Sequence, residues 1–346
     1  MMIAALLLAL SPQEAAPCVE KLLAMQEADG SWPYEGAYRV RGEIPLAYRV
    51  AGTSIVAGAL LQAAPGDAAV RRAADRGLAY VLLHLGDPLL APSTDDAYDV
   101  RIWGQAAALE FLAQFPRRTK DIDGQIERLI RTMAIEEIPG GGWNYARHDA
   151  PASFVTVPVV QALLFARGQG FSVSLDELDR ARKSLEAARA DDGAFLYSGT
   201  FKGGQTRTTS DERAGSAARA TACEATLRLL GGGSLEHLVG ALGAFHDGWA
   251  ELEKRSRKPG AHAGPYQIAP YYFFYGHRFA AQAIQLLPEA SRAAERERLK
   301  TLLARTQDAD GTWNDRVFVP AKAYGTTMAL LGLLADRASL PPALGR

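Results

Sequence analysis

The chain of 346 residues contains little cysteine and carries almost no net charge. Its two cysteines, Cys18 and Cys223, are too few for a disulfide scaffold or a four-cysteine zinc site. The formal net charge of −1 does not provide the basic surface with which nucleic-acid-binding proteins hold phosphates, so we expect no nucleic-acid partner. These absences leave a globular protein with one large domain or two ordinary ones.

Long apolar runs are also missing. The longest uncharged apolar run at either end, residues 2–10, would cover about 14 Å as a helix, whereas the core of a bilayer is about 30 Å thick. We therefore predict no transmembrane span. The run suits the core of a signal peptide, although no Lys or Arg precedes it. We expect residues 1–11 to be a signal peptide or N-terminal extension and the protein to be exported to the periplasm or cell envelope. If residues 1–11 are retained, the protein is instead cytoplasmic.

Repetition is the most informative feature that is present. Residues 22–32 read LLAMQEADGSW and residues 302–313 read LLARTQDADGTW, with weaker copies at 141–145 and 190–195. The aromatic positions 32, 143, 195 and 313 fit a period of about 56 residues, since five intervals span 313 − 32. This period predicts further turns near residues 88 and 257. The residues that define the repeat are Gln26, Gly30, Trp32, Trp143, Phe195, Gln307, Gly311 and Trp313.

Each repeat contains two helical stretches of different character. One is amphipathic and charged, which predicts a helix with one face in solvent. The other is nearly uncharged, which predicts a helix buried on all sides. The first kind covers residues 68–85, 123–135, 175–188 and 291–305. The second covers residues 53–64, 102–114, 154–166, 217–230, 279–287 and 323–334.

Twelve alternating helices predict an all-α (α/α)6 toroid, in which six helical hairpins form an inner ring of six helices inside an outer ring of six. An open solenoid would also alternate, but it needs two capping ends that face solvent. Here the first and last repeats carry the two best copies of the motif, which favours a closed ring.

The Gln-x2-5-Gly-x-Trp pattern at residues 26–32 and 307–313 resembles the QW repeat of squalene and oxidosqualene cyclases. The chain as a whole resembles the prenyltransferase/squalene-cyclase-like α/α toroid proteins. The resemblance implies one toroid domain over residues 12–340, followed by a tail at 341–346. It also implies that the glutamines and tryptophans of the repeat stiffen the outer helices. It indicates the fold better than the function, because one fold serves many chemistries.

Candidate catalytic residues precede the second buried helix. Class II terpene cyclases of similar fold protonate an alkene with an Asp-x-Asp-Asp motif, and the corresponding string here is Asp95-Asp96-Ala97-Tyr98-Asp99. Crowded carboxylates raise one another's pKa, so Asp95, Asp96 or Asp99 could retain a proton. The family motif itself is absent. The alternative is that these aspartates cap the helix and occupy its positive first turn.

Candidate ligand-binding residues lie where the buried helices begin, because these ends converge on one mouth of a closed ring. They are Arg101, Trp103, Thr156, Arg219, Tyr271, Tyr272, Tyr275, His277 and Tyr324. The aromatic rings could stabilise a carbocation. Tyr, His and Arg near residues 271–278 also resemble the base and charge-neutralising groups of polysaccharide lyases. For His277 a structural role is the competing interpretation.

No metal or other cofactor is expected. Protein prenyltransferase β subunits bind zinc through Asp, Cys and His, but their Asp-x-Cys motif is missing here. The six histidines form no local pair four residues apart, and Cys223 is most simply a small buried apolar residue.

Three hypotheses for function remain. The first is a toroid that binds or cyclises an apolar isoprenoid-type ligand in its central cavity, without zinc. The second is a non-catalytic binding or assembly module of the envelope, which would have a protein partner. The third is a carbohydrate-active toroid of lyase or hydrolase type. The expected small ligand is accordingly a lipid or an oligosaccharide.

Overall fold

The computed structural model describes residues 12–36, 42–92, 100–145, 150–201, 206–260, 262–334 and 337–344. These residues form twelve α-helices, three short 3-10 helices and isolated β-bridges only. The outer helices are α1 (Pro12–Ala24), α3 (Ala68–His84), α5 (Lys120–Glu136), α7 (Leu175–Ala187), α9 (Leu235–Arg255) and α11 (Glu289–Arg305). The inner helices are α2 (Leu46–Ala63), α4 (Arg101–Gln114), α6 (Ser153–Gly168), α8 (Arg213–Leu229), α10 (Tyr272–Gln285) and α12 (Lys322–Leu333).

The two kinds of helix pack as their polarity predicts. In the outer helix α5, one apolar stripe that includes Ile122, Ile126 and Leu129 is buried, and charged residues cover the rest. In the inner helix α6, thirteen of sixteen residues are buried, because neighbouring helices cover it on every side. Cys18 and Cys223 are both buried and unbonded.

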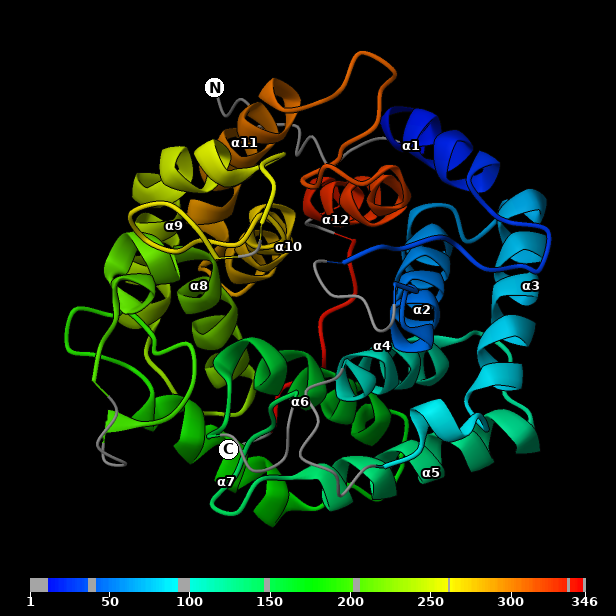
Figure 1. Cartoon of the computed structure of the whole chain (residues 1–346), viewed down its shortest axis with the longest axis horizontal. Helices are drawn as coiled ribbons and strands as arrows, with labels where there is room; N and C mark the ends of the chain where they lie inside the picture. Colours follow the sequence, from blue (N-terminus) through cyan, green and yellow to red (C-terminus); the bar gives the residue numbers. More distant parts are fainter. Residues whose placement is uncertain are drawn as a thin grey trace, which may run out of the picture.

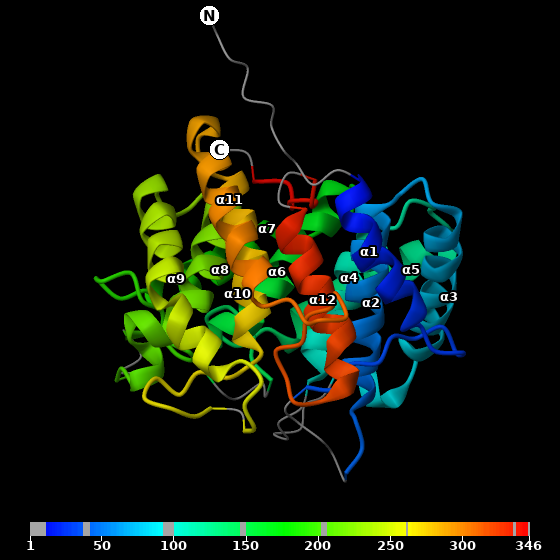
Figure 2. The same cartoon turned by 90° about the horizontal axis from the view of Figure 1, so that it is seen from above.

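The inner ring is closed. Each inner helix packs against the next, and α12 returns to pack against α2. Figure 1 shows this ring surrounded by the outer helices. The protein is therefore an (α/α)6 toroid, as the repeat predicted. Figure 2 shows that the loops leading into the inner helices gather at one end, which we call the mouth. The opposite end, where the inner helices finish, is the base.

One described helix, α2, is long and apolar enough to cross a membrane by length and composition. It belongs to the inner ring, where it packs against α3, α4 and α12. This packing accounts for its apolar surface.

The aromatic residues of the repeat hold each turn against both helices of its hairpin. Each tryptophan indole donates to the carbonyl ten residues earlier, and each tryptophan backbone N–H donates to a threonine hydroxyl on the following inner helix. The tryptophan–carbonyl pairs are Trp32–Leu22, Trp143–Met133 and Trp313–Leu303, and the threonines are Thr53, Thr156 and Thr326. At the fourth copy, the N–H of Phe195 donates to the hydroxyl of Ser216 over 3.3 Å.

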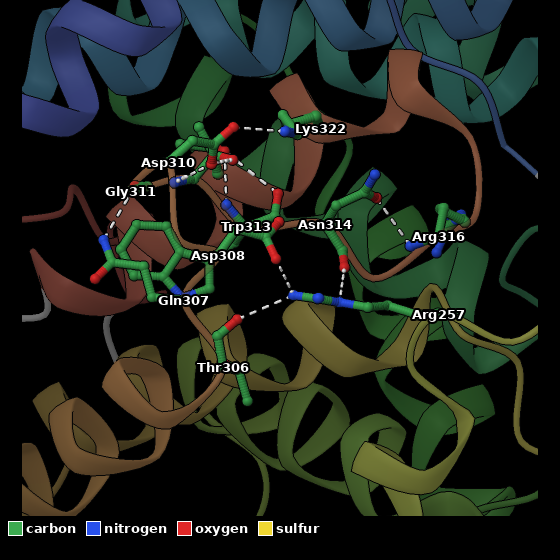
Figure 3. A network of polar contacts seen from close by, with 12 residues as sticks. Arg257, Thr306, Gln307, Asp308, Asp310, Gly311, Trp313, Asn314, Arg316 and Lys322 are labelled. Carbon is green, nitrogen blue, oxygen red and sulfur yellow. Dashed lines mark hydrogen bonds and ion pairs between the residues drawn. The ribbon is translucent and has the colours of Figure 1, made fainter.

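The two turns predicted near residues 88 and 257 are also present. The first lies between α3 and the 3-10 helix Pro88–Leu90. At the second, Arg257 adopts a left-handed backbone with φ of 61° and donates its side chain to the carbonyls of Thr306 and Asn314. Figure 3 shows Arg257 reaching across to the last aromatic turn, where it also pairs with Asp308 over 2.6 Å. It thereby ties the fifth repeat to the sixth.

Candidate functional site at the mouth

Two clusters of aromatic side chains lie at the mouth. In the first, the ring of Tyr34 lies 4.5 Å from that of Tyr324 and 5.4 Å from that of Trp103, with Tyr48 beside them. These residues come from the first, second and last repeats, so the cluster forms at the seam where the ring closes. In the second cluster, Phe154 of α6 packs on three tyrosines at the start of α10. They are Tyr271, Tyr272 and Tyr275.

A buried ion pair lies between the two clusters. Arg316 is 4% exposed and pairs with Asp315, which is fully buried, over 3.1 Å. The guanidinium donates to the hydroxyl of Tyr34 over 2.8 Å and lies 5.0 Å from the ring centre of Tyr271 and 5.9 Å from those of Tyr34 and Tyr324. Burial lowers the pKa of Arg316, but the Asp315 carboxylate, Tyr34 and Tyr324 together outweigh burial and hold that pKa above its ordinary value. The mouth therefore contains a permanent cation surrounded by aromatic faces.

A second buried arginine has the same kind of surroundings. Arg219 is 1% exposed, pairs with Asp211 over 3.3 Å and donates to the carbonyl of Ser210 over 2.6 Å. Its guanidinium lies 5.5 Å from the ring centre of Tyr197 and 5.4 Å from that of Tyr272. Asp211 also accepts the backbone N–H of Tyr197 over 2.6 Å, which fixes the loop before α8.

The outer surface of the mouth is polar and hollowed. The hydroxyl of Tyr271 lies 3.1 Å from Nε2 of His262, and Nδ1 of that imidazole lies 3.0 Å from the carbonyl of Gln267. A carbonyl only accepts, so Nδ1 carries the proton and Nε2 accepts from Tyr271. Beside them is a pocket of about 70 Å³ whose lining includes Lys258, Tyr271 and Arg316.

Below the mouth, side chains close the ring axis. Glu110 of α4 and Arg278 of α10 form an ion pair over 2.6 Å, and these two helices stand opposite each other in the six-membered inner ring. Gln161 of α6 bonds to both Thr226 and Gln282 at a similar depth. The pockets that touch the Glu110–Arg278 pair have volumes of about 10 and 20 Å³. The open central cavity that the isoprenoid hypothesis expects is thus absent at this level within the described residues.

The predicted site residues divide into three groups. Asp95, Asp96 and Asp99 lie outside the described residues. Six of the predicted ligand-binding residues lie together at the mouth, in or against the two aromatic clusters: Trp103, Arg219, Tyr271, Tyr272, Tyr275 and Tyr324. Arg101 begins α4 and donates to the carbonyl of Ala91 over 3.1 Å.

Thr156 and His277 have structural roles in the described chain. The hydroxyl of Thr156 is engaged by the N–H and carbonyl of Trp143. His277 is fully buried, with Nδ1 against the carbonyl of Phe273 and Nε2 accepting from the indole of Trp249 over 2.9 Å. Burial lowers its pKa to about 4, so the ring is neutral at physiological pH. The hydroxyl of Thr156 and both ring nitrogens of His277 are thus engaged by the protein itself.

Several mouth residues could not be identified from the sequence. Arg316 bonds to Tyr34, which lies 282 positions earlier in the sequence. Asp315 and Asp211 belong to the site because they form ion pairs with the two buried arginines. A signal for Arg316 exists only in hindsight: it follows the last aromatic turn by three residues, at the point where the ring closes.

No family model matches this chain, and no curated protein sequence matches it either. Solved structures do share its fold. An inactive variant of the α-1,6-mannanase GH76A of Salegentibacter sp. HEL1_6, with two consecutive aspartates replaced by asparagine and α-1,6-mannotriose bound, is 11% identical. That alignment has a TM-score of 0.59 and covers 94% of this chain and 99% of the other.

Two further neighbours have different descriptions. A variant of the type II terpene cyclase MstE from Scytonema, in complex with geranylgeranyl dihydroxybenzoate, is 12% identical over 93% of this chain and 96% of its own, with a TM-score of 0.57. The Lin0763 protein from Listeria innocua is 13% identical over 94% and 97% of the two chains, with a TM-score of 0.54. At such low identity these likenesses establish the toroid fold and leave the chemistry open.

Proposed function

We propose that this protein is a carbohydrate-active toroid that binds an oligosaccharide at the mouth and cleaves it with Asp95 and Asp96 as its carboxylate pair. The observation that supports this proposal best is the presence of two buried arginine–aspartate pairs among tyrosine rings. Sugars present hydroxyl groups at their edges and apolar C–H faces. A site with charged hydrogen-bonding groups beside aromatic faces matches both features.

The distribution of tyrosines around the mouth supports the same ligand. Four of them are only partly buried, and they lie in the segments that lead into α6, α8 and α10. They are Tyr145, Tyr197, Tyr266 and Tyr271. Partly exposed rings offer stacking faces to a chain of sugars lying across the mouth.

The same geometry argues against cyclisation of an isoprenoid in this place. A carbocation about 5 Å from the Arg316 guanidinium would be repelled by about 3 kcal/mol at an effective dielectric constant near 20. The rings of Tyr34, Tyr271 and Tyr324 already surround this cation. The Glu110–Arg278 pair also closes the space along the ring axis that a long apolar chain would need.

The choice of Asp95 and Asp96 follows from elimination between two pairs of consecutive aspartates. In the pair Asp191–Asp192, Asp192 accepts the N–H of Ala194 over 3.1 Å and pairs with Arg207 over 3.0 Å. Asp192 therefore stabilises the turn that contains Phe195. Asp95–Asp96 comes shortly before α4 in the sequence. Glycoside hydrolysis needs two carboxyl groups, one as general acid and one as base or nucleophile. The inactivation of the mannanase by replacing two consecutive aspartates supports the assignment.

We also propose that the protein is exported, which fits this activity. The apolar run at residues 2–10 would direct the chain out of the cytoplasm, and polymeric glycans are found outside it.

The test is to incubate the full chain with α-1,6-mannotetraose and a panel of other soluble oligosaccharides. Calorimetry would measure binding, and chromatography would measure products. We expect at least one oligosaccharide to be bound and cleaved. Asp95→Asn and Asp96→Asn should each lower turnover by about 10²–10⁴-fold while leaving binding intact, and Asp192→Asn is the matched control that should retain activity.

Other outcomes separate the competing hypotheses. Binding without turnover would overturn the catalytic assignment and leave a glycan-binding module. Failure to bind any sugar, together with cyclisation of a geranylgeranyl substrate, would overturn the proposal in favour of a terpenoid cyclase.

A further inference from the structure

A second pocket opens at the base of the ring, at the end opposite the mouth. Its volume is about 430 Å³, within the range of about 300–1,000 Å³ typical of small-molecule sites. Its walls come from the C-terminal ends of α2, α4 and α6. Among the described residues, none of the proposed glycan site and none of the predicted site residues lines it.

The C-terminal segment 337–344, which we call the strap, forms the remaining wall. The N–H of Ser339 donates to Gln62 of α2 over 3.0 Å, and the N–H of Leu344 donates to the carbonyl of Leu229 of α8 over 2.8 Å. Pro342 packs so closely on Gly168 that a Cβ there would lie 2.4 Å from its ring. Figure 1 shows the strap running from α12 across the ring toward α6. The strap therefore spans the base and forms one side of the pocket.

The inner part of this pocket contains one hydrogen-bonding atom without a partner in the described chain, and a second lies in the smaller hollow beneath it. Gln114 lines both the pocket and the smaller hollow beneath it, and its Oε1 is buried with no hydrogen-bond partner among the described residues. Ser54 lines the same hollow, is 1% exposed, and its Oγ also lacks a partner within the described chain. Buried polar atoms are usually satisfied, so these two indicate a place for a polar group of a ligand.

The rest of the lining limits the ligand's chemistry. Leu61, Phe111, Phe165 and Leu340 supply an apolar wall. Three helices end at this pocket, and their negative C-terminal dipoles disfavour a carboxylate. An ammonium group is disfavoured by Arg337, a cation that also lines the pocket, and an ionised carboxylate has no proton to donate to Oε1 of Gln114.

We propose that the base pocket binds an uncharged amphiphile of the long-chain alcohol class. The hydroxyl group of the ligand donates to Oε1 of Gln114, while the alkyl body lies on Phe111, Phe165 and Leu340. The strap covers the ligand once it is bound.

The experiment compares three probes that differ only in the head group: 1-decanol, decanoate and decylamine. Calorimetry on the full chain should show micromolar binding of 1-decanol and about tenfold weaker binding of the two charged probes. Gln114→Leu, which keeps the size of the side chain and removes the acceptor, should weaken 1-decanol about tenfold. Tyr271→Phe, at the mouth, is the control that should leave 1-decanol binding unchanged.

Filling the pocket provides a second test. Gly58 lines it, and a Cβ there would meet only the ring of Phe111 at an ordinary 3.7 Å. Gly58→Leu should abolish binding of 1-decanol, whereas Gly58→Ala should preserve it. A melting temperature for each variant shows whether it has folded. Photolabelling of the unaltered protein with a diazirine analogue of decanol, mapped by mass spectrometry, needs no folded variant and should mark peptides around Phe111, Phe165 and Leu340.

Equal affinity for the three probes, tighter binding of decylamine or decanoate, or unchanged binding in folded Gly58→Leu would each overturn the proposal. Labelling confined to the mouth would also overturn it. None of these results bears on glycan binding, so the two proposals can fail separately.

Discussion

Replacing Arg316 with methionine should destabilise the protein strongly, because it leaves the carboxylate of Asp315 buried without a cation. Asp315 is fully buried, and Arg316 is the partner that offsets its charge. Removing one partner of a buried ion pair costs about 3–5 kcal/mol. Loss of the hydrogen bond to the hydroxyl of Tyr34 adds about 1 kcal/mol. We expect a total loss of about 4–6 kcal/mol near neutral pH.

The loss should depend on pH in a defined direction. Burial raises the pKa of Asp315 above its ordinary value, and Arg316 opposes this rise. In Arg316→Met the folded-state pKa rises further above the unfolded value of about 3.9. Stability is then highest below the unfolded pKa and falls as pH rises through the folded one, because the unfolded chain releases its proton first. The difference between the variant and the natural protein should begin to grow only above the folded pKa of Asp315 in the natural protein, which already lies above the unfolded value, and should increase toward neutrality.

Urea unfolding followed by circular dichroism at several pH values measures both effects. Asp315→Asn combined with Arg316→Met is the matched control. It has no buried charge at this site, so it should recover more than half of the lost stability and should not show the pH dependence of the single variant. A loss below about 1 kcal/mol in Arg316→Met, or a loss independent of pH, would show that Asp315 is not held as a buried carboxylate.

Three further predictions concern the repeat and the core. Thr156→Val should cost about 1 kcal/mol in urea unfolding because it removes the hydroxyl bonded to Trp143, and an equal loss in Thr156→Ser would contradict this explanation. His277 should stay neutral down to about pH 5 in an NMR titration, since its pKa is about 4. Because this folded pKa lies below the unfolded value near 6.5, about 3 kcal/mol of stability present above pH 6.5 is lost as pH falls through 4; titration near 6.5 would rule this out. Gly325→Ala should destabilise by about 2 kcal/mol, because the new Cβ would lie 2.6 Å from the carbonyl oxygen of Trp313, and a raised melting temperature would refute this close approach.

The fold could be predicted from the sequence because its signals are local and repeated. Helical spacing of apolar residues distinguishes α5 from α6 without reference to the rest of the chain. The copies at Trp32 and Trp313 give the period and indicate closure, and the structure shows both turns with the same indole-to-carbonyl hydrogen bond.

The candidate site could be predicted only in part. Aromatic residues at the start of α10 were expected at the mouth, and they lie there. The role of His277 could not be read from the sequence, because the indole that satisfies it belongs to Trp249 on another helix. Residue type alone does not say whether a polar group already has a partner.

By itself, the sequence determined the twelve helices, their alternation and the aromatic turns, because hydrogen bonds and apolar spacing within a few residues specify each of them. Only the tertiary structure decided what occupies the ring. Closure brings Arg316 to Tyr34 and Glu110 to Arg278, pairs separated by 282 and 168 positions, and so places cations where an open apolar cavity had been expected. No local pattern encodes such contacts, because they depend on how six hairpins meet around one axis.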